Sequence, residues 1–470
     1  MKYLSALVIF SLVSLEIFSQ QQVLINDLAA FKAPGPTWKM AREVSADLEK
    51  ENVLIAKDGQ GILVNLPDKK KRGADLFTKS EFGDMDLELD FMMAKGSNSG
   101  IYLHGRYELQ LMDSWNLKVP AAGTNGGIYQ RWDENRPEGE KGYEGYAPRQ
   151  NASRAPGLWQ NLKISFQAPR FDANGKKIEH AKMLKVELNG VTIHEDVALS
   201  GPTRGSSGEE MSTGPLRIQG DHGAVAFRNI KITDFGKARP ESLEQQGRRS
   251  RVYPIEVEPW EIPVFRSFMD LPGGKRVVHA VSVGSPSNVH YTYDTDKGTI
   301  IQVWRGGFLD ATPMWYSRGD GSSRPRGAVQ RFGDPALSVA KLTSRESTWA
   351  ADTLGSGFRP MGYRLDAGEN PVFMYRINGA KVSDAVQALS NGEGIRRDLT
   401  VTGSVKDLYV RLAEGREIRE VKDGFYAIDD NAYYLKVESP GKEKPFVRNL
   451  NGKRELLIAV SGQLKYTILF

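Results

Sequence analysis

The sequence predicts an all-β protein built from two domains. The chain of 470 residues contains 48 Gly and 23 Pro, which are the residues that favour turns. Short segments alternate between apolar and polar residues with the two-residue period of β-strands. The length exceeds that of one ordinary domain. We therefore expect two β-rich, sandwich-like domains in succession.

The composition excludes several classes of function. Hydrophobic residues make up 40% and charged residues 26% of the chain, as in ordinary globular proteins. The net charge is only +5, and basic residues are interspersed with acidic ones, so we expect no nucleic-acid partner. The chain has no Cys, which excludes disulfides, thiolate metal sites and c-type haem attachment.

The first 20 residues have the pattern of a cleaved secretory signal. Lys2 precedes an apolar run over residues 4–15, and polar residues follow from Gln21. The run is too short for a membrane span, and no later segment is long and apolar enough for one. We therefore expect a periplasmic or secreted protein without a membrane span.

The first domain is expected over residues 36–236, after an irregular lead-in. Residues 84–93 alternate strictly, with Leu87, Leu89 and Phe91 on one face and acidic residues on the other. Further strands are expected at residues 159–166, 183–188, 216–219 and 224–232. Many short strands separated by turn signals favour a sandwich or a jelly roll.

The most informative stretch is residues 98–113, which alternates as a strand or hairpin. One face carries the apolar residues Ile101, Leu103, Tyr107, Leu109 and Leu111, which are expected to face the core. The other face carries what we name the polar ladder, composed of Tyr102, His104, Arg106, Glu108 and Gln110. Antiparallel strands commonly show water a polar face, so the pattern alone fits a solvated surface as well as a site.

A second polar patch lies in residues 216–230. Arg217 and Gln219 share one strand face, and Asp221, His222 and Gly223 then turn the chain. A His at a strand end beside Gly is accessible and can act as a general base near neutral pH. The alternative is a turn that only caps a hairpin.

Long loops and a linker separate the expected strands. Residues 131–151 and 201–214 are insertions, and the first is either a gate over a groove or surface decoration. Residues 237–255 are polar and aperiodic, which predicts the domain linker. Residues 256–470 are expected to form a β-rich accessory domain, with one short helix at residues 383–389. Residues 306–320, with Asp310, Trp315, Arg318 and Asp320, fit either a sugar site or a structured loop.

Standard catalytic motifs are missing from the sequence. We find no Gly-x-Ser-x-Gly elbow, no Walker loop and no His-Glu-x-x-His motif. The six His residues never occur at the i, i+4 spacing of a helical metal site. Chemistry is therefore expected at the two polar patches.

Six ordered motifs resemble the 3-keto-disaccharide hydrolase family over residues 38–235. They lie at residues 98–113, 127–129, 156–161, 188–191, 214–219 and 225–230. The resemblance implies a concanavalin-like jelly roll whose concave face carries the polar ladder. It also implies an exported bacterial glycosidase of carbohydrate metabolism that cleaves 3-keto-glycosides, with a functional link to a sugar 3-dehydrogenase. The family usually reads Gln-x-His-Gly, whereas two residues, Gly220 and Asp221, separate Gln219 from His222 here. The second domain weakly resembles a module of exported bacterial proteins, which implies no chemistry.

The chemistry that the resemblance implies needs three groups. A ketone at C3 acidifies the C2 proton, so a base can form an enolate and expel the C1 oxygen by β-elimination; water then adds. Such a site needs a base, a cation for the enolate oxygen and a proton donor for the leaving group. Arg106 or a divalent metal would hold the enolate. Glu108, Asp113 and His222 are the candidates for base and acid, in an order that the sequence leaves open.

The remaining expectations concern binding. The candidate substrate-binding residues are Asn98, Tyr102, His104, Gln110, Arg217 and Gln219. If a divalent metal is the cofactor, Glu108, Gln110 and His222 supply oxygen and nitrogen ligands; otherwise no cofactor is expected. The substrate is expected to be a carbohydrate. The alternative function is a non-catalytic carbohydrate-binding protein, because the same sandwich serves lectins and fold does not dictate function.

Overall fold

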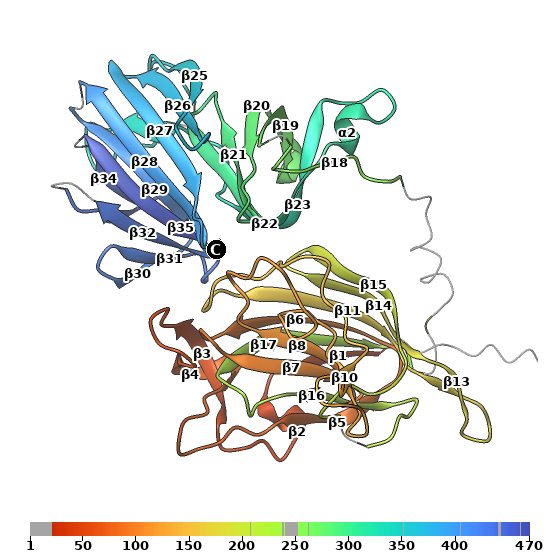
Figure 1. The fold of residues 1–470 in the computed structure, drawn as a ribbon. Coiled ribbons are helices and arrows are strands. Elements are labelled where there is room, and N and C mark those ends of the chain that lie inside the picture. Colours follow the sequence, from red (N-terminus) through yellow and green to blue (C-terminus); the bar gives the residue numbers. More distant parts are fainter. Residues whose placement is uncertain are drawn as a thin grey trace, which may run out of the picture.

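The structure is a computed structural model that describes residues 21–206, 208–236, 239, 252–261, 263–350, 352–404, 406–439, 443–460 and 462–470. The expected signal peptide and most of the expected linker lie outside these ranges. Two β-rich halves pack against each other near the carboxyl end of the chain (Figure 1). Among the described residues, no helix is long and apolar enough to cross a membrane.

The first half is a sandwich of two antiparallel sheets. The larger sheet has the order β15 (Val191–Leu199), β14 (Ala181–Leu188), β11 (Gln160–Gln167), β6 (Met85–Met93), β17 (Val225–Asp234), β4 (Leu54–Asn65) and β3 (Trp38–Ala46), and β1 (Gln21–Ile25) also pairs with β17. The five-stranded sheet has the order β2 (Phe31–Lys32), β5 (Leu76–Phe82), β16 (Gly214–Ile218), β7 (Asn98–Leu103) and β8 (Tyr107–Met112). Short hairpins are formed by β9 (Arg131–Trp132) with β10 (Gly142–Tyr143) and by β12 (Arg170–Phe171) with β13 (Lys177–Glu179).

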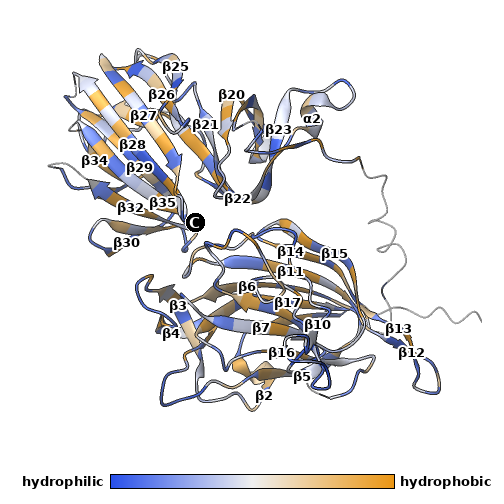
Figure 2. Ribbon diagram, in the orientation of Figure 1, coloured by the Kyte–Doolittle hydropathy of each residue, from blue (hydrophilic) through white to orange (hydrophobic). Residues whose placement is uncertain are grey.

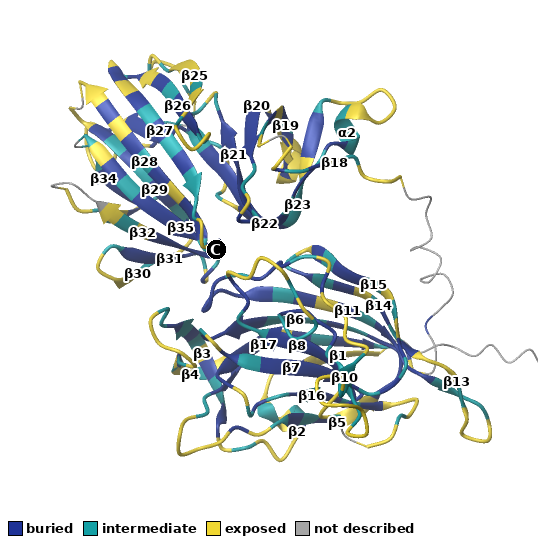
Figure 3. Ribbon diagram, viewed as in Figure 1, coloured by how far each residue is buried: buried dark blue, intermediate teal, exposed yellow. Residues whose placement is uncertain are grey.

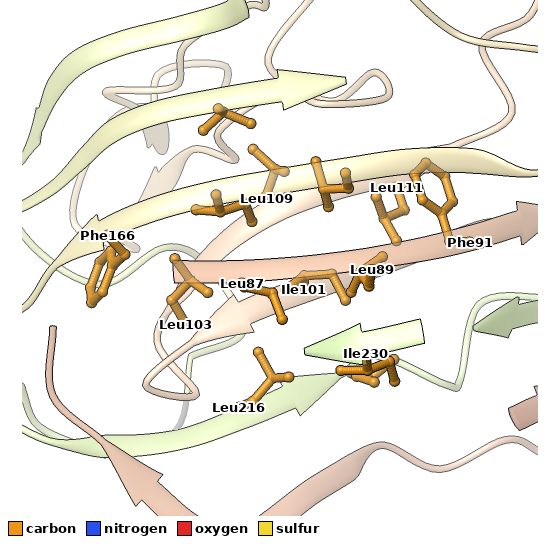
Figure 4. Packing of buried hydrophobic residues seen from close by; sticks show 14 of the residues in the cluster. Leu87, Leu89, Phe91, Ile101, Leu103, Leu109, Leu111, Phe166, Leu216 and Ile230 are labelled. Atoms are coloured by element: carbon orange, nitrogen blue, oxygen red, sulfur yellow. The ribbon is translucent and has the colours of Figure 1, made fainter. Parts of the chain in front are cut away.

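The apolar strand faces that the two-residue period predicts form the core of this sandwich. Leu87, Leu89 and Phe91 of β6 pack against the apolar face of the hairpin, which includes Ile101 and Leu109 (Figure 4). All of these side chains are buried, and β6, β7 and β8 are largely dark blue in Figure 3. Burying one such side chain contributes about 1.5–3 kcal/mol, so the pattern strongly fixes which face of each strand points inward.

Two segments differ from expectation. The chain before residue 36 is not only a lead-in, because residues 21–25 form β1 and bury Ile25 against the core. Residues 383–389 are not a helix, because residues 383–388 belong to β27 (Ala380–Ala388), which pairs on both sides with other strands. Val382 and Val386 of β27 are buried on one face, so tertiary pairing and period-two burial outweigh local helix propensity there.

The second half joins a small barrel to two further sheets. The barrel sheet contains β18 (Glu256–Val257), β19 (Val264–Leu271), β20 (Lys275–Val283), β21 (Val289–Asp294), β22 (Thr299–Asp310) and β23 (Ser322–Arg331). Because β23 pairs with both β19 and β22, the strands from β19 to β23 close into a ring. A single helical turn, α2 (Thr312–Trp315), follows β22. Trp315 lies there in a T-shaped contact with Phe265, with the ring centroids 5.8 Å apart.

The other two sheets of this half are sandwich-like. One has the order β24 (Val339–Lys341), β29 (Leu408–Gly415), β34 (Lys453–Ala459) and β33 (Phe446–Leu450). The other has the order β25 (Arg359–Leu365), β26 (Pro371–Ile377), β27, β28 (Gly394–Gly403), β35 (Gln463–Leu469), β32 (Tyr433–Ser439), β31 (Phe425–Ile428) and β30 (Ile418–Lys422). Their strands alternate between hydrophilic and hydrophobic residues in Figure 2. The expectation of an all-β protein with sandwich-like sheets is confirmed.

The two halves share a buried, partly polar interface. Trp115 packs among apolar side chains of both halves, and its indole Nε1 donates a hydrogen bond of 2.8 Å to the carbonyl of Phe470. Arg154 donates from Nη1 to Gln330 Oε1 at 2.7 Å and to the Ala432 carbonyl at 3.0 Å. In return, Arg305 Nε donates to the Ser153 carbonyl at 3.1 Å. Burial lowers the pKa of both arginines to about 10, so both remain charged at neutral pH.

This interface gives a stability prediction. Trp115→Ala removes a buried ring and its hydrogen bond, so we expect the free energy of unfolding to fall by about 3–5 kcal/mol in urea titrations. The matched control is Trp260→Ala, because Trp260 is 72% exposed and should change stability little. Equal effects of the two substitutions would contradict the interface described above.

Candidate functional site

The site is built on the hairpin of β7 and β8. His104 and Gly105 have φ values of 54° and 68°, and together with Arg106 they form a three-residue connection between the two strands. The resulting register pairs Tyr102 with Glu108 and Gly100 with Gln110. Tyr102, Glu108 and Gln110 therefore share the outer face of the five-stranded sheet, as predicted, while the odd-numbered residues enter the core.

His104 does not belong to the polar ladder. Its ring is buried, its Nε2 donates to the Gly83 carbonyl at 3.0 Å, and it packs edge-on against Phe166 of the larger sheet. Burial lowers the pKa of this imidazole. The expectation that His104 stands in the polar ladder is therefore wrong, because His104 lies in the connection between the strands and not in either strand. A substrate-binding role for it stays a prediction.

Arg106 follows the turn and also leaves the ladder. Its Nη1 donates to the His104 carbonyl at 2.8 Å, and its own carbonyl accepts from the amide and the hydroxyl of Thr203, both at 3.0 Å. A Cβ on Gly214 would lie 2.8 Å from Nη1, so the guanidinium packs against the loop of residues 201–214. The expectation that Arg106 stands in the row with Glu108 is therefore wrong.

Asp113 is tied to the loops at the end of β8. Its Oδ2 accepts from the Gly96 amide at 2.9 Å, and its Oδ1 accepts from the Trp115 amide at 3.3 Å. The strand ends at Met112, so the alternation that would aim Asp113 has already stopped. Asp113 therefore fixes the strand end, and its expected role as acid or base is not supported.

Five side chains lie side by side across the outer face. We name them the central row: Phe77, Arg217, Tyr102, Glu108 and Tyr129. Arg217 of β16 pairs with Phe77 of β5 on one side and with Tyr102 on the other. Tyr102 pairs with Glu108, and the Tyr129 amide donates to the Glu108 carbonyl at 3.0 Å. Tyr129 belongs to a segment that continues the sheet beyond β8, since Ile128 bridges to Leu109. Tyr129 lies in the sequence motif at residues 127–129, but it was not among the site residues predicted from the sequence.

A second line of residues, named the glycine row, lies next to the central row. The Gln219 amide donates to the Gly100 carbonyl at 2.9 Å, Gly100 pairs with Gln110, and the Gln110 amide donates to the Gly127 carbonyl at 2.8 Å. A Cβ on Gly100 would lie 2.4 Å from Glu108 Oε1, so the carboxyl of Glu108 occupies the space above this glycine. A side chain at position 100 would therefore displace the Glu108 carboxyl from this space.

Glu108 has the titration behaviour that acid–base chemistry needs. The residue is only 2% exposed, and loss of hydration raises the pKa of its carboxyl to about 7. A hydrogen bond from the Tyr102 hydroxyl and the charge of Arg217 oppose this rise in pKa. Near neutral pH the carboxyl can therefore take up and release a proton.

Arg217 is the cation beside Tyr102 and Glu108. Its Nε and Nη2 lie 2.7 and 2.5 Å from Asp75 Oδ2, and its Nη1 donates to the Gly205 carbonyl at 2.6 Å. Its guanidinium lies over the ring of Tyr102, with Cζ 4.2 Å from the ring centroid. Asp75 was missed in the sequence because no motif marks it; it also accepts from the Gly220 amide at 2.9 Å.

His222 lies at the end of the glycine row. Its Nδ1 is 3.2 Å from Gln219 Nε2 and is hydrogen-bonded to the Asp221 carboxylate, and its side chain is 51% exposed. Among the described residues, Gln219 Oε1 is buried and has no hydrogen-bond partner. Gln110 Nε2 donates to Asn98 Oδ1 at 2.5 Å. The structure thus brings an accessible imidazole and three amide side chains to one end of the face.

The two insertions meet beside these rows. The guanidinium of Arg204 lies 3.8 Å from the ring centroid of Trp132, and Glu210 accepts from the Tyr107 hydroxyl at 2.6 Å. Lys177 forms a 2.5 Å ion pair with Glu210. A Cβ on Gly205 would lie 3.3 Å from the Tyr102 hydroxyl, so the loop of residues 201–214 lies over the central row.

The donors named for a metal are Glu108, Gln110 and His222. Within the described part of the chain, no group of three or more His, Asp or Glu side chains is placed to hold a metal ion. Glu108 is engaged with Tyr102, Gln110 with Asn98, and His222 with Asp221. Each of the three named donors thus already has a hydrogen-bond partner, and a metal at this position stays a prediction.

The raised pKa of Glu108 predicts a pH-dependent stability. The pKa of the Glu108 carboxyl is about 7 in the folded protein, above the ordinary value of 4.5. The stabilisation that the protonated carboxyl contributes is therefore fully present below pH 4.5 and is lost as the pH rises through 7. Glu108→Gln should therefore increase the free energy of unfolding at pH 8 by about 3 kcal/mol and leave it nearly unchanged at pH 4.

Urea unfolding at the two pH values measures this effect. The matched control is Glu88→Gln, because the Glu88 side chain is 44% exposed beside Lys163. If Glu108→Gln is no more stabilising at pH 8 than at pH 4, the carboxyl is not desolvated as described.

Comparison with known proteins gives a family match over most of the first half. Residues 21–233 match the family model of the 3-keto-alpha-glucoside-1,2-lyase-like domain. No curated protein matches the chain. Among solved structures, two that are each named a "putative glycosyl hydrolase" from Parabacteroides distasonis are similar. One is 25% identical with a TM-score of 0.31, and the match covers 45% of this chain and 83% of the other. Another is 21% identical with a TM-score of 0.26, and the match covers 42% of this chain and 98% of the other. The binding domain of botulinum neurotoxin serotype D is 7% identical with a TM-score of 0.24, covering 97% and 93%.

The family match covers the residues of the site. The central row, the glycine row, Asp75 and His222 all lie within residues 21–233. The match indicates a carbohydrate-active domain that acts on glycosides. The resemblance inferred from the six motifs is therefore confirmed over this segment of the chain.

Proposed function

We propose that the outer face of the five-stranded sheet cleaves 3-keto-glycosides by β-elimination across C1 and C2, followed by hydration. The observation that carries this proposal is the Glu108 carboxyl, buried above Gly100 with a pKa of about 7 beside Tyr102 and Arg217. The proposal is supported by the family match of the surrounding segment.

The geometry suggests a role for each group. Glu108 accepts the C2 proton, and the electron pair of that bond moves to the C3 carbonyl to form the enolate. Arg217 and the Tyr102 hydroxyl stabilise the oxygen that gains negative charge, as preorganised donors do. The enolate then re-forms the C3 ketone as the C1–C2 double bond forms and the C1–oxygen bond breaks. His222 donates a proton to the departing oxygen.

Hydration completes the reaction. Water adds its hydroxyl group to C1 and a proton returns to C2, so the overall change is hydrolysis. Glu108 exchanges the proton taken from C2 with solvent and then supplies a proton to C2, for which a pKa near neutrality is suited. The remaining proton of the water replaces the one that His222 donated. Asn98, Gln110 and Gln219 supply amide groups for sugar hydroxyls, and the unpartnered Gln219 Oε1 is available as an acceptor.

The proposal extends to the setting of the enzyme. We propose that the protein acts in the periplasm or outside the cell, as its first 20 residues suggest. Its substrate must come from an enzyme that oxidises the C3 hydroxyl of a glycoside to a ketone, such as a sugar 3-dehydrogenase.

An assay on paired substrates tests the proposed reaction. We expect release of p-nitrophenol from p-nitrophenyl 3-keto-glucoside and negligible release from the unoxidised glucoside, because only the ketone makes the C2 proton acidic. In deuterated buffer, the sugar product should carry deuterium at C2. Cleavage of the unoxidised glucoside without exchange at C2 would indicate an ordinary two-carboxylate glycosidase. Saturable binding without release from either substrate would support a carbohydrate-binding protein instead.

A pair of arginine variants tests which cation stabilises the enolate. Arg217→Met should lower kcat for the 3-keto-glucoside about 100-fold, as expected for loss of one oxyanion-stabilising group. Arg106→Met is the matched control and should lower it much less, because Arg106 packs against Gly214 rather than in the central row. Arg217→Lys should recover part of the activity. A larger loss in Arg106→Met than in Arg217→Met would assign the role to Arg106.

A further inference from the structure

The barrel of the second half opens into a cleft distant in sequence from the site above. The cleft has a volume of about 650 Å³ and lies between the turn from β19 to β20, the turn from β21 to β22 and the turn from β33 to β34. This volume is in the range of small-molecule sites, which often occupy the mouths of β-barrels.

The walls of this cleft combine apolar and balanced charged groups. Leu271, Val277 and Trp349 are buried apolar residues of the lining. The charged lining residues are the cations Lys275, Arg276, Lys297, Arg411 and Lys453 and the anions Asp294, Asp296, Asp334, Glu414 and Glu455. Five positive charges thus face five negative charges. A cleft without net charge does not select a strongly charged ligand.

Most of these charges already have partners. Lys275 forms an ion pair of 2.6 Å with Asp334, Lys453 one of 2.5 Å with Glu414, and Arg411 one of 2.9 Å with Glu455. Arg276 is paired with Asp270 and Asp320, and Asp296 with His279. Lys297 donates to the Pro335 carbonyl at 2.7 Å.

Asp294 is the exception. Its side chain ends β21, and the residue is 3% exposed. Its Oδ1 accepts from the Asp296 amide at 2.9 Å, but no Lys or Arg of the described residues forms an ion pair with it. Burial raises the pKa of this carboxyl to about 6. An ionised carboxylate can accept several hydrogen bonds, so Asp294 retains unused acceptor capacity.

Polar groups continue from Asp294 into the barrel. Thr292 lies two residues earlier on the same strand face, and its hydroxyl is 3.0 Å from Ser282 Oγ and 3.3 Å from Gln302 Nε2. Gln302 is fully buried, and its Oε1 has no hydrogen-bond partner among the described residues. Unsatisfied buried acceptors are rare and costly in folded proteins. Asp294 thus lines the cleft itself, and Thr292 and Gln302 continue the polar groups into the barrel behind the residues that line the cleft.

We propose that this cleft is a second ligand site, which binds a neutral, hydroxyl-rich small molecule such as a mono- or disaccharide. Asp294 accepts hydrogen bonds from ligand hydroxyls, and Leu271, Val277 and Trp349 contact the carbon-bearing faces of the ring. The balanced rim admits a neutral molecule without leaving an unpaired charge. The proposal does not depend on the reaction proposed for the first half.

Isothermal titration of the full chain with trehalose, sucrose and cellobiose tests this site. At least one of these disaccharides should bind saturably. Asp294→Asn should weaken that binding about tenfold or more, as expected for losing a hydrogen bond to a charged group. Asp58→Asn is the matched control, because the Asp58 side chain is 86% exposed in the first half and lies outside the cleft, and it should change the Kd less than about twofold. Thermal unfolding of each variant checks that it is folded.

A second variant keeps the test independent of Asp294. Val278 is 49% exposed on the cleft wall, so Val278→Trp should fill the cleft and weaken the same binding. No saturable binding, or equal binding by wild type and both folded variants, would overturn the proposal. Loss of binding in Arg217→Met but not in Asp294→Asn would place the ligand on the five-stranded sheet instead. Tighter binding of glucosamine than of glucose would overturn the assignment to a neutral ligand.

Discussion

The register of β7 against β8 is the constraint on which the rest of the candidate site depends. The three-residue connection of His104, Gly105 and Arg106 fixes which residues face each other, and the core fixes which face points inward. A slip of one residue would exchange Leu109 with Glu108, placing a carboxyl in the core and a leucine on the outer face. Because several buried leucine and isoleucine side chains each contribute about 1.5–3 kcal/mol, such a slip is strongly disfavoured. The position of the site is thus set by the hydrophobic core beneath it.

The same hairpin explains how the Glu108 carboxyl can be buried at a position suited to proton transfer. Gly100 leaves space for the Glu108 carboxyl, and Tyr102 and Arg217 partly compensate for its lost hydration. The compensation is incomplete, so the pKa rises to about 7 and the ionised form costs stability. Functional sites often accept such a cost. The arrangement links a local packing feature, a glycine under a glutamate, to the capacity for proton transfer.

The sequence predicted those parts of the site that follow from strand periodicity. Tyr102, Glu108 and Gln110 on one hairpin, and Arg217 and Gln219 on a second strand, lie on one face as expected. His104, Arg106 and Asp113 were misplaced because the alternation stops at a turn or at a strand end. Asp75 and Tyr129 are brought in by pairing between distant segments, which a local pattern does not contain. For the same reason, the pairing of β1 and the strand at residues 380–388 were not anticipated.

The pH dependence of C2 proton exchange tests the central claim most directly. If the buried Glu108 carboxyl removes this proton, exchange into 3-keto-glucoside should increase with pH through about 7 and then level off. In Glu108→Gln, exchange should fall to the rate without enzyme at every pH, while Glu88→Gln retains the full profile. A profile that is flat between pH 5 and 8, or exchange that survives in Glu108→Gln, would show that another group is the base.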